Sequence, residues 1–165
     1  MSSSESMPES KNDPQPDANS ACFREYAPRD FARICALDQL CFPSEIAYTP
    51  EEIAAALSQP RTICIVSEQS DEVIGFILLQ YRRSAGHIIT IDLHPDIRRR
   101  GIGGRLMELA EQRLVNCDVR RVVLEVAVDN DPAMAFYRGR GYAIVRLLPR
   151  YYRNKTDAYL MEKAL

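Results

Sequence analysis

The turn at residues 98–104, with the sequence Arg-Arg-Arg-Gly-Ile-Gly-Gly, combines residue types that bind phosphate. A β-rich run at 86–93 precedes it, and apolar residues at helical spacing follow it, so the glycines open a helix. At a helix start the backbone N–H groups and the positive end of the helix dipole point to one place. Gly101 and Gly103 leave room for an anion, and a neighbouring arginine adds charge-assisted contacts. The turn predicts a diphosphate site.

Three other interpretations of this turn compete with that one. A P-loop requires Gly-Lys-Ser/Thr, which the sequence excludes because Arg105 and Leu106 follow Gly104. A Rossmann fingerprint requires a small residue in place of Leu106 and a carboxylate at the end of the next strand, whereas Glu125 falls inside Val-Leu-Glu-Val-Ala-Val. A plain turn with a solvated arginine run is the simplest alternative. The turn alone does not name the cofactor.

The composition is that of an ordinary globular domain. The 165 residues are 46% hydrophobic and 27% charged, which is enough for one domain with a core. A net charge of -2 predicts no nucleic-acid partner. Neither a signal segment nor a membrane-spanning run is present, so we expect a cytoplasmic protein without a membrane partner. Residues 1–20 are polar and Pro-rich, which predicts a disordered tail before a folded domain at 21–165.

The cysteines and histidines show no metal-binding pattern. His87 and His94 lie far from any cysteine pair in the sequence, so we expect no metal site. The odd number of cysteines, the absence of a Cys-x-x-Cys pair and their apolar neighbours predict reduced thiols buried in the core. These cysteines are Cys22, Cys35, Cys41, Cys64 and Cys117.

The other elements follow from hydrophobic periodicity and from turn residues. Thr49-Pro50-Glu51-Glu52 predicts a capped helix start, and Gln69-Ser70-Asp71 predicts a hairpin turn. We expect strands at 21–26, 62–68, 73–82, 86–93, 121–128, 142–148 and 158–161. We expect helices at 28–40, 49–57 and 132–138, and a long helix after the glycine turn. The order is β-α-α-β-β-β-α-β-α-β-β, which is an α/β fold.

Three segments resemble the Gcn5-related N-acetyltransferase (GNAT) superfamily. Its Arg/Gln-x-x-Gly-x-Gly/Ala motif is matched by Arg98, Gly101 and Gly103. The block 124–142 is similar to the Leu-Glu-Val, Asn, Ala, Tyr and Gly-Phe/Tyr pattern of the ribosomal-protein alanine acetyltransferases, the RimI-like family. Tyr-Tyr at 151–152 and Asp-Ala-Tyr-Leu-Met at 157–161 resemble the ending of protein N-terminal acetyltransferases. The similarity spans about residues 21–165.

The resemblance implies a mixed, mostly antiparallel sheet of about seven strands flanked by about four helices, with acetyl-CoA as cosubstrate. Pantetheine and diphosphate would lie along one strand and the glycine turn, at Ile91, Asp92, Leu93, Arg98, Arg99, Arg100, Gly101, Ile102, Gly103 and Gly104. Asn130 and Tyr137 would also contact coenzyme A. The acceptor would lie at Phe42, Pro43, Tyr48, Tyr151 and Tyr152. The loop at 42–48 is longer than the Phe-Pro or Leu-Pro loops associated with known peptide selectivity, so the resemblance does not name the acceptor.

The resemblance also implies roles in proton transfer. Glu125 matches the family's proposed general base, Tyr137 matches the tyrosine that protonates the departing thiolate, and His87 matches a position where related eukaryotic enzymes have a tyrosine base. Each has a simpler alternative: Glu125 as a buried carboxylate paired with an arginine, Tyr137 as a core aromatic, and His87 as a histidine on the sheet surface. Tyr151 and Tyr152 would clamp a peptide backbone or would be exposed loop aromatics.

The expected function is direct transfer of an acetyl group from acetyl-CoA to the N-terminal α-amine of a protein, in a ternary complex, by a monomer or weak dimer. An attacking amine must be neutral, and the reference pKa is about 8 for an α-amine against about 10.4 for lysine, so an N-terminus needs less help. A lysine or a small-molecule amine is the alternative acceptor. A noncatalytic acyl-CoA-binding regulator is the alternative from another class, against which Glu125, Asn130 and Tyr137 argue together.

Overall fold

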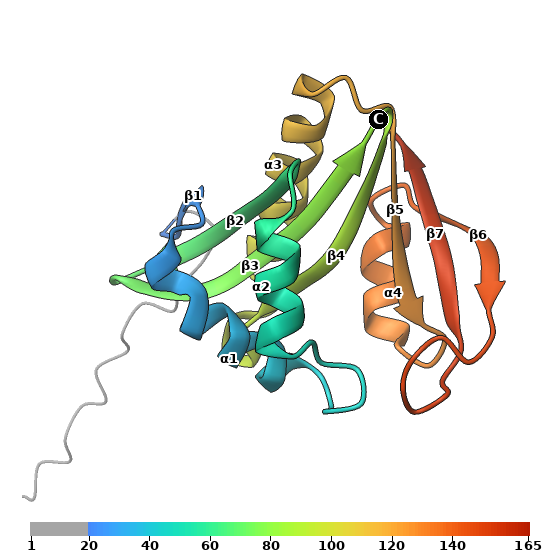
Figure 1. Cartoon of the computed structure of the whole chain (residues 1–165), viewed down its shortest axis with the longest axis horizontal. Coiled ribbons are helices and arrows are strands. Elements are labelled where there is room, and N and C mark those ends of the chain that lie inside the picture. The colour runs from blue at the N-terminus through green and yellow to red at the C-terminus, as the bar shows by residue number, and fades with distance from the viewer. Residues whose placement is uncertain (1–19) are drawn as a thin grey trace, which may run out of the picture.

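Seven strands form one mixed sheet in the computed structural model, which describes residues 20–165 (Figure 1). The strands are β1 Cys22–Glu25, β2 Thr62–Gln69, β3 Glu72–Arg82, β4 Ala85–Leu93, β5 Arg121–Ala127, β6 Ala143–Leu148 and β7 Ala158–Ala164. The helices are α1 Phe31–Cys41, α2 Pro50–Ser58, α3 Ile102–Asn116 and α4 Asp131–Arg138, with 3-10 turns at Pro28–Asp30 and Pro95–Ile97. The predicted order of elements is confirmed. The expected tail lies outside the described residues except for Ser20.

The sheet consists of two antiparallel halves, β1-β2-β3-β4 and β5-β7-β6, joined by the parallel strands β4 and β5. This junction is short, because the pairing runs only from Ala85 and Arg121 to His87 and Val123. Beyond it the two strands diverge toward their carboxyl ends, as Figure 1 shows. The predicted mixed, mostly antiparallel sheet is confirmed.

Helices cover both faces of the sheet, so β3 is buried on both sides. α1 and α2 pack on one face and α3 and α4 on the other (Figure 1). Alternate residues of β3 enter the two cores: Phe76 and Leu78 lie under α1 and α2, and Ile77 and Leu79 lie under α3 and α4. A continuous apolar strand of this kind is what a sheet covered on both faces requires.

The start of α2 follows the predicted cap, whereas α1 differs from its prediction. The Thr49 hydroxyl accepts from the backbone N–H of Glu52, and the Glu52 carboxylate accepts from the backbone N–H of Thr49. Pro28 begins a 3-10 turn, and the α-helix starts at Phe31. Leu40, the last residue of the helix expected at 28–40, is 53% exposed, whereas the side chain of Asp38 is fully buried.

All five cysteines are free thiols, as predicted, but their burial differs from one to the next. Cys35 and Cys64 are buried in the core, and Cys41 and Cys117 are half-buried. Cys22 is exposed, because it lies at the start of the edge strand β1 with its side chain directed away from the core. Full burial was therefore a wrong prediction for Cys22.

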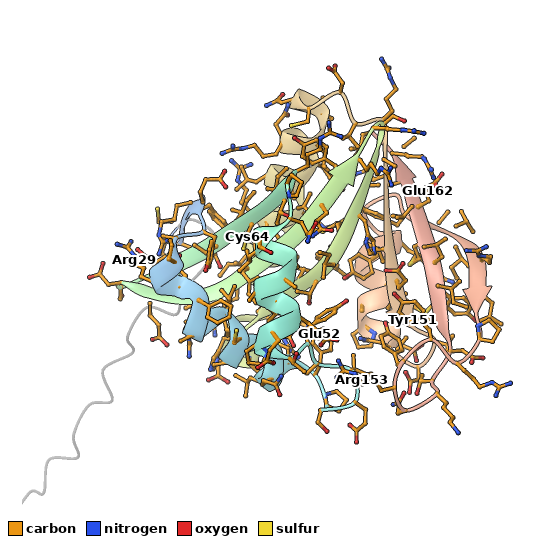
Figure 2. All side chains as sticks on the ribbon, viewed as in Figure 1. Arg29, Glu52, Cys64, Tyr151, Arg153 and Glu162 are labelled. Carbon is orange, nitrogen blue, oxygen red and sulfur yellow. The ribbon has the colours of Figure 1, made fainter. Side chains whose placement is uncertain are left out.

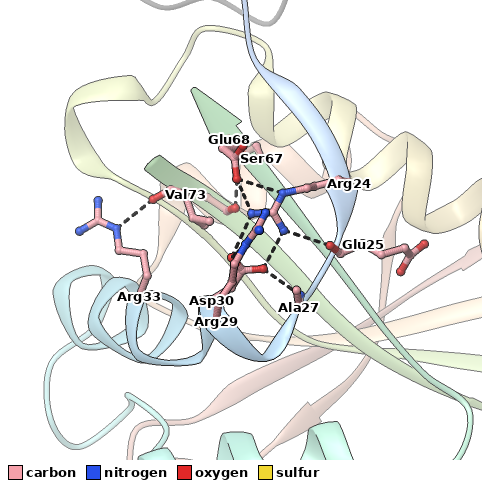
Figure 3. A network of polar contacts seen from close by, with 10 residues as sticks. Arg24, Glu25, Ala27, Arg29, Asp30, Arg33, Ser67, Glu68 and Val73 are labelled. Carbon is pink, nitrogen blue, oxygen red and sulfur yellow. Dashed lines mark hydrogen bonds and ion pairs between the residues drawn. The ribbon is translucent and has the colours of Figure 1, made fainter. Parts of the chain in front are cut away.

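Arg24 on β1 connects three elements at this end of the sheet (Figure 3). Its guanidinium donates to both carboxylate oxygens of Asp30, at 2.7 and 3.0 Å, and to Glu68 on β2. Asp30 is 4% exposed, and it also accepts from the backbone N–H of Ala27 at 2.8 Å. The hydrogen bonds from Arg24 hold the pKa of Asp30 below its usual range. This network attaches the start of α1 to the sheet.

Replacing Arg24 with Met should lower the free energy of unfolding by about 3 kcal/mol, because it leaves the buried Asp30 carboxylate without its cation. Urea denaturation at pH 7 measures the change. Arg29→Met is the matched control, since Arg29 is 74% exposed and lies 3.9 Å from the same carboxylate, and it should change the stability by less than about 0.5 kcal/mol. If Arg24→Met lowers the free energy of unfolding no more than Arg29→Met does, the buried Asp30 carboxylate does not depend on Arg24.

Candidate functional site

A cleft of about 710 Å³ opens where β4 and β5 diverge. This volume lies within the range of about 300–1,000 Å³ that is typical of small-molecule sites. The walls come from both strands, from the glycine turn and the first turn of α3, from α4, and from the segment 41–48 that follows α1. The sequence-predicted residues that line it are Phe42, Tyr48, Ile91, Leu93, Arg98, Arg99, Gly101, Gly103, Gly104, Glu125, Asn130, Tyr137 and Tyr152.

A β-bulge at Ile89 sets the direction of the side chains along the last part of β4, residues 90–93. Leu78 pairs with Thr90 and Leu79 pairs with Ile88, so Ile89 has no partner residue on β3. After the bulge, Ile91 and Leu93 pack on the α3 side, where they line the cleft. Past the end of its pairing with β5, the backbone edge of β4 faces the cleft. Such an edge can hydrogen-bond an extended amide-containing ligand.

The same bulge turns Asp92 away from the cleft, toward α1. Its side chain is 1% exposed and accepts from the Thr90 hydroxyl at 3.0 Å. Ile102 is likewise buried in the core, and Arg100 does not line the cleft. The side chains of Asp92 and Ile102 therefore do not contact a ligand there. Contacts through the backbone of these residues stay a prediction.

The glycine turn has the geometry of an anion-binding helix start. Arg99 and Gly101 have φ values of 63° and 81°, so the chain passes through the left-handed region just before α3 begins at Ile102. A Cβ on Gly103 would lie 3.0 Å from Leu93 Cδ1, and one on Gly104 would lie 2.0 Å from Arg140 Nη2. The first turn of α3 thus presents bare backbone beside arginines, which fits a diphosphate.

Asn130 and Tyr137 form the α4 wall of the cleft. The side-chain oxygen of Asn130 caps α4 by accepting from the backbone N–H of Ala133 at 3.2 Å, which leaves the amide NH₂ as a donor. Tyr137 lines the cleft and packs edge-on against Phe136 and Tyr142. Burial raises the pKa of Tyr137, so its hydroxyl keeps its proton at neutral pH and can act as a donor.

Glu125 and His87 form a pair at the point where β4 and β5 separate. Glu125 Oε2 lies 2.6 Å from His87 Nε2. The Glu125 side chain is 17% exposed and that of His87 is 41% exposed, so neither is sealed from solvent. The arginine partner expected in the structural alternative for Glu125 is wrong, because its carboxylate pairs with this histidine. The arrangement can accept a proton and pass it outward.

Aromatic side chains from two loops cover the end of the cleft next to Glu125. Tyr151 and Tyr152 pack edge-on at 5.1 Å, and the Tyr48 hydroxyl lies 3.5 Å from the carbonyl oxygen of Ile89. Burial raises the pKa of Tyr151, and the nearby Glu125 carboxylate raises it further. Tyr151 is 45% exposed and does not line the cleft, so the structure leaves it at the rim. Pro43 is exposed and also lies outside the lining.

Arg153 joins these two loops across the open end of the cleft (Figure 2). Its Nη2 donates to the Glu52 carboxylate at 2.8 Å, and its Nη1 donates to the carbonyl oxygen of Ala47 at 3.1 Å. The loop between β6 and β7 is thereby attached to the start of α2. A smaller hollow of about 330 Å³, lined by His87, Tyr48 and residues of α2, continues from this end.

Sequence reasoning missed Arg140, Cys41 and Asp38. Arg140 lines the cleft from the turn after α4, where its guanidinium packs over the Phe136 ring. The Cys41 thiol lies 3.2 Å from the carbonyl oxygen of Leu93 and also faces the cleft. Asp38 stands among apolar residues at helical spacing, where a carboxylate is unusual.

Asp38 and Asp92 form a buried carboxyl pair behind the cleft. Both are at most 1% exposed, and each has one oxygen without a hydrogen-bonding partner, Oδ1 of Asp38 and Oδ2 of Asp92. One shared proton satisfies both atoms, because a protonated carboxyl donates to the other. Burial raises the pKa of Asp38 to about 6, and burial together with the neighbouring Asp38 charge raises that of Asp92. Asp38 also accepts from the backbone N–H of Tyr48 at 2.7 Å, so the pair connects the loop between α1 and α2 to β4.

Within residues 20–165, no three His, Cys, Asp or Glu side chains are grouped so that they could hold a metal ion. No helix in this part of the chain is long and apolar enough to cross a membrane.

The model of the Acetyltransferase (GNAT) family matches residues 21–142. The chain belongs to this family. It is therefore a GNAT-type acetyltransferase, and the resemblance noted in its sequence is confirmed. An uncharacterized N-acetyltransferase of Methanocaldococcus jannaschii is 32% identical over 144 residues, covering 86% of this chain and 90% of that protein. An N-alpha-acetyltransferase of Sulfurisphaera tokodaii is 29% identical over 160 residues, covering 86% and 95%.

Solved structures share the GNAT fold seen here. Ard1 from Thermoplasma volcanium superposes with a TM-score of 0.81 at 28% identity, covering 88% of this chain and 98% of that one. The ribosomal-protein-S18-alanine N-acetyltransferase of Escherichia coli gives 0.79 at 20% identity, covering 87% and 93%. A GNAT family acetyltransferase from Elizabethkingia anophelis with acetyl-CoA bound gives 0.72 at 18% identity, covering 89% and 99%. The last two likenesses show the fold alone.

Asp92→Asn should change how the stability of this GNAT domain depends on pH. Burial and the neighbouring Asp38 charge raise the pKa of Asp92 on folding, so this carboxyl stabilises the fold fully below its unfolded pKa of about 4, and the contribution is lost as the pH rises through the folded pKa. In the variant, an amide can donate to Asp38 without titrating. Between pH 4 and 7, wild type should therefore lose stability relative to Asp92→Asn, measured by urea denaturation at several pH values. Asp96→Asn, at a residue whose side chain is 86% exposed, is the control. Parallel curves for wild type and Asp92→Asn would contradict the shared proton.

Proposed function

We propose that the protein transfers the acetyl group of acetyl-CoA directly to the N-terminal α-amine of a protein substrate, with both substrates bound together. The observation that carries this proposal is the Glu125 and His87 pair at 2.6 Å. The pair lies at the point where β4 and β5 separate, between the wall formed by Tyr137 and the loops that contain Tyr48 and Tyr152. The pair can take a proton, and it lies between the end of the cleft at the glycine turn, which we assign to the cofactor, and the end at Tyr48 and Tyr152, which we assign to the amine substrate and call the acceptor end.

Acetyl-CoA fits the end of the cleft that lies at the glycine turn. The bare backbone at Gly103 and Gly104, with Arg98 and Arg99 beside it, suits a diphosphate. The backbone edge of β4 and the amide of Asn130 suit the amide groups of pantetheine. Acetyl-CoA bound in this way supplies the thioester carbonyl that the amine attacks. The relative from Elizabethkingia anophelis, which has the same fold, has acetyl-CoA bound.

Two side chains of this chain would move the protons. The amine nitrogen forms the new bond to the carbonyl carbon as the carbon–sulfur bond breaks, so one proton must leave the nitrogen and one must reach the thiolate. Glu125 takes the proton from the amine, directly or through water, and His87 holds the Glu125 carboxylate in place. Tyr137, which keeps its proton at neutral pH, donates to the departing thiolate.

A peptide N-terminus suits the acceptor end better than an extended lysine side chain does. Tyr48, Tyr152 and the Arg153 bridge bring two loops together over that end of the cleft, which Glu125 also lines. An α-amine also requires less deprotonation at neutral pH than a lysine does. The Sulfurisphaera tokodaii relative is named an N-alpha-acetyltransferase, which supports the same class of acceptor.

Turnover should be confined to peptides with a free N-terminus. The assay measures thiol release from acetyl-CoA with short peptides in matched pairs, free or blocked at the N-terminus, including one that starts with alanine and a blocked peptide whose sole amine is a lysine. Mass spectrometry locates the acetyl group. Turnover of the blocked lysine peptide alone would redirect the proposal to side-chain amines. Binding of acetyl-CoA without turnover on any peptide would favour a noncatalytic regulator.

Glu125→Gln should lower kcat/KM for the acceptor by about a hundredfold or more, because the amide keeps the shape and the contact with His87 but cannot take a proton. Steady-state kinetics with the peptide of highest turnover measure the effect. Glu162→Gln on the neighbouring strand β7 is the matched control, since Glu162 pairs with Arg121 outside the cleft and should leave kcat/KM unchanged. If both variants keep full turnover, Glu125 is not the base.

A further inference from the structure

Arg140 lies in the turn after α4, and its guanidinium reaches the start of α3. The position is set on two sides. Its Cζ lies 4.9 Å from the centre of the Phe136 ring, in a cation–π contact, and its Nη2 occupies the space where a Cβ of Gly104 would stand, 2.0 Å away. Gly104 is the third residue of α3, so the guanidinium lies against the first turn of that helix.

This position is electrostatically unfavourable for a cation in the absence of an anion. The first turn of a helix has a positive partial charge, which stabilises anions and repels arginine. The nearest carboxylate is that of Glu108, which is 57% exposed and 3.9 Å from Arg140 Nη1. Among residues 20–165, no acceptor lies within hydrogen-bonding distance of the Arg140 side chain. A charge placed against a helix dipole is a local conflict of the kind that functional sites contain.

We infer that Arg140 is a ligand of the cofactor diphosphate. From the turn after α4 it adds a guanidinium to the anion site formed by the glycine turn. This inference rests on the proposed binding of acetyl-CoA. The diphosphate would receive backbone N–H groups from the first turn of α3 and N–H groups from the planar guanidinium that lies beside this turn. An anion bound to both groups at once offsets the repulsion between Arg140 and the helix dipole. The 26% exposure of the Arg140 side chain leaves its nitrogens open to the cleft.

The test measures dissociation constants by calorimetry for coenzyme A, for 3′-dephospho-coenzyme A and, by NMR titration, for pantetheine. The first two ligands share the diphosphate, and the third has no phosphate. The variants are Arg140→Met and Arg140→Lys, with Arg138→Met as the matched control, because Arg138 is exposed at the end of α4, two residues before Arg140, and does not line the cleft. Thermal unfolding without ligand checks that each variant folds.

Arg140→Met should weaken coenzyme A and 3′-dephospho-coenzyme A equally, by about tenfold to a hundredfold, and leave pantetheine unchanged. Arg140→Lys should fall between wild type and Met, since a lysine keeps the charge but not the planar fork. Without ligand, the Met variant should unfold at the same temperature as wild type or higher, because it lacks the cation beside the helix start.

Three results would overturn the inference. A loss with coenzyme A that disappears with the dephospho form would assign Arg140 to the 3′-phosphate. Equal losses with all three ligands would make the role structural. Affinities like those of Arg138→Met would remove Arg140 from the site. Failure of the wild-type protein to bind coenzyme A is a different outcome, which contradicts the proposed function itself.

Discussion

The site depends on the separation of two parallel strands after three residue pairs. A fully paired sheet would close the gap between β4 and β5 and bury both backbone edges in hydrogen bonds. Here the strands are held together at His87 and Val123, and the helices on both faces keep the diverging halves in place. The cleft is therefore a consequence of sheet topology. The reactive groups need only stand on the residues that border the gap.

The β-bulge at Ile89 has an equally large effect, because side-chain direction in a strand alternates with every residue. Without the extra residue, Asp92 would point to the α3 side and Ile91 to the α1 side. With it, the apolar Ile91 and Leu93 face the cleft and α3, and Asp92 meets Asp38 on α1. One inserted residue thus separates a ligand-binding face from a buried acidic face on the same short strand.

The sequence was most informative where local chemistry is strong. The Thr49 cap, the helix that begins after the glycine turn and the strand that contains Glu125 are all present as expected, because each depends on residues near in sequence. The pairing of Glu125 with His87 could not be derived, since it depends on the register between strands 38 residues apart. The burial of Asp92 was missed for a similar reason: bulges leave no reliable pattern in a single sequence.

Charge is distributed unevenly along the cleft, and this asymmetry suits the two substrates that we propose. The carboxylate of Glu125 lies at the acceptor end, where a protonated amine arrives with a positive charge. Arg98, Arg99 and Arg140 lie at the other end with the dipole of α3, where phosphates are negative. Because each end repels the other end's ligand, the field orients both substrates before any contact specific to their shape. A net charge of -2 for the whole chain hides this arrangement, which arises from how β4 brings the two ends together.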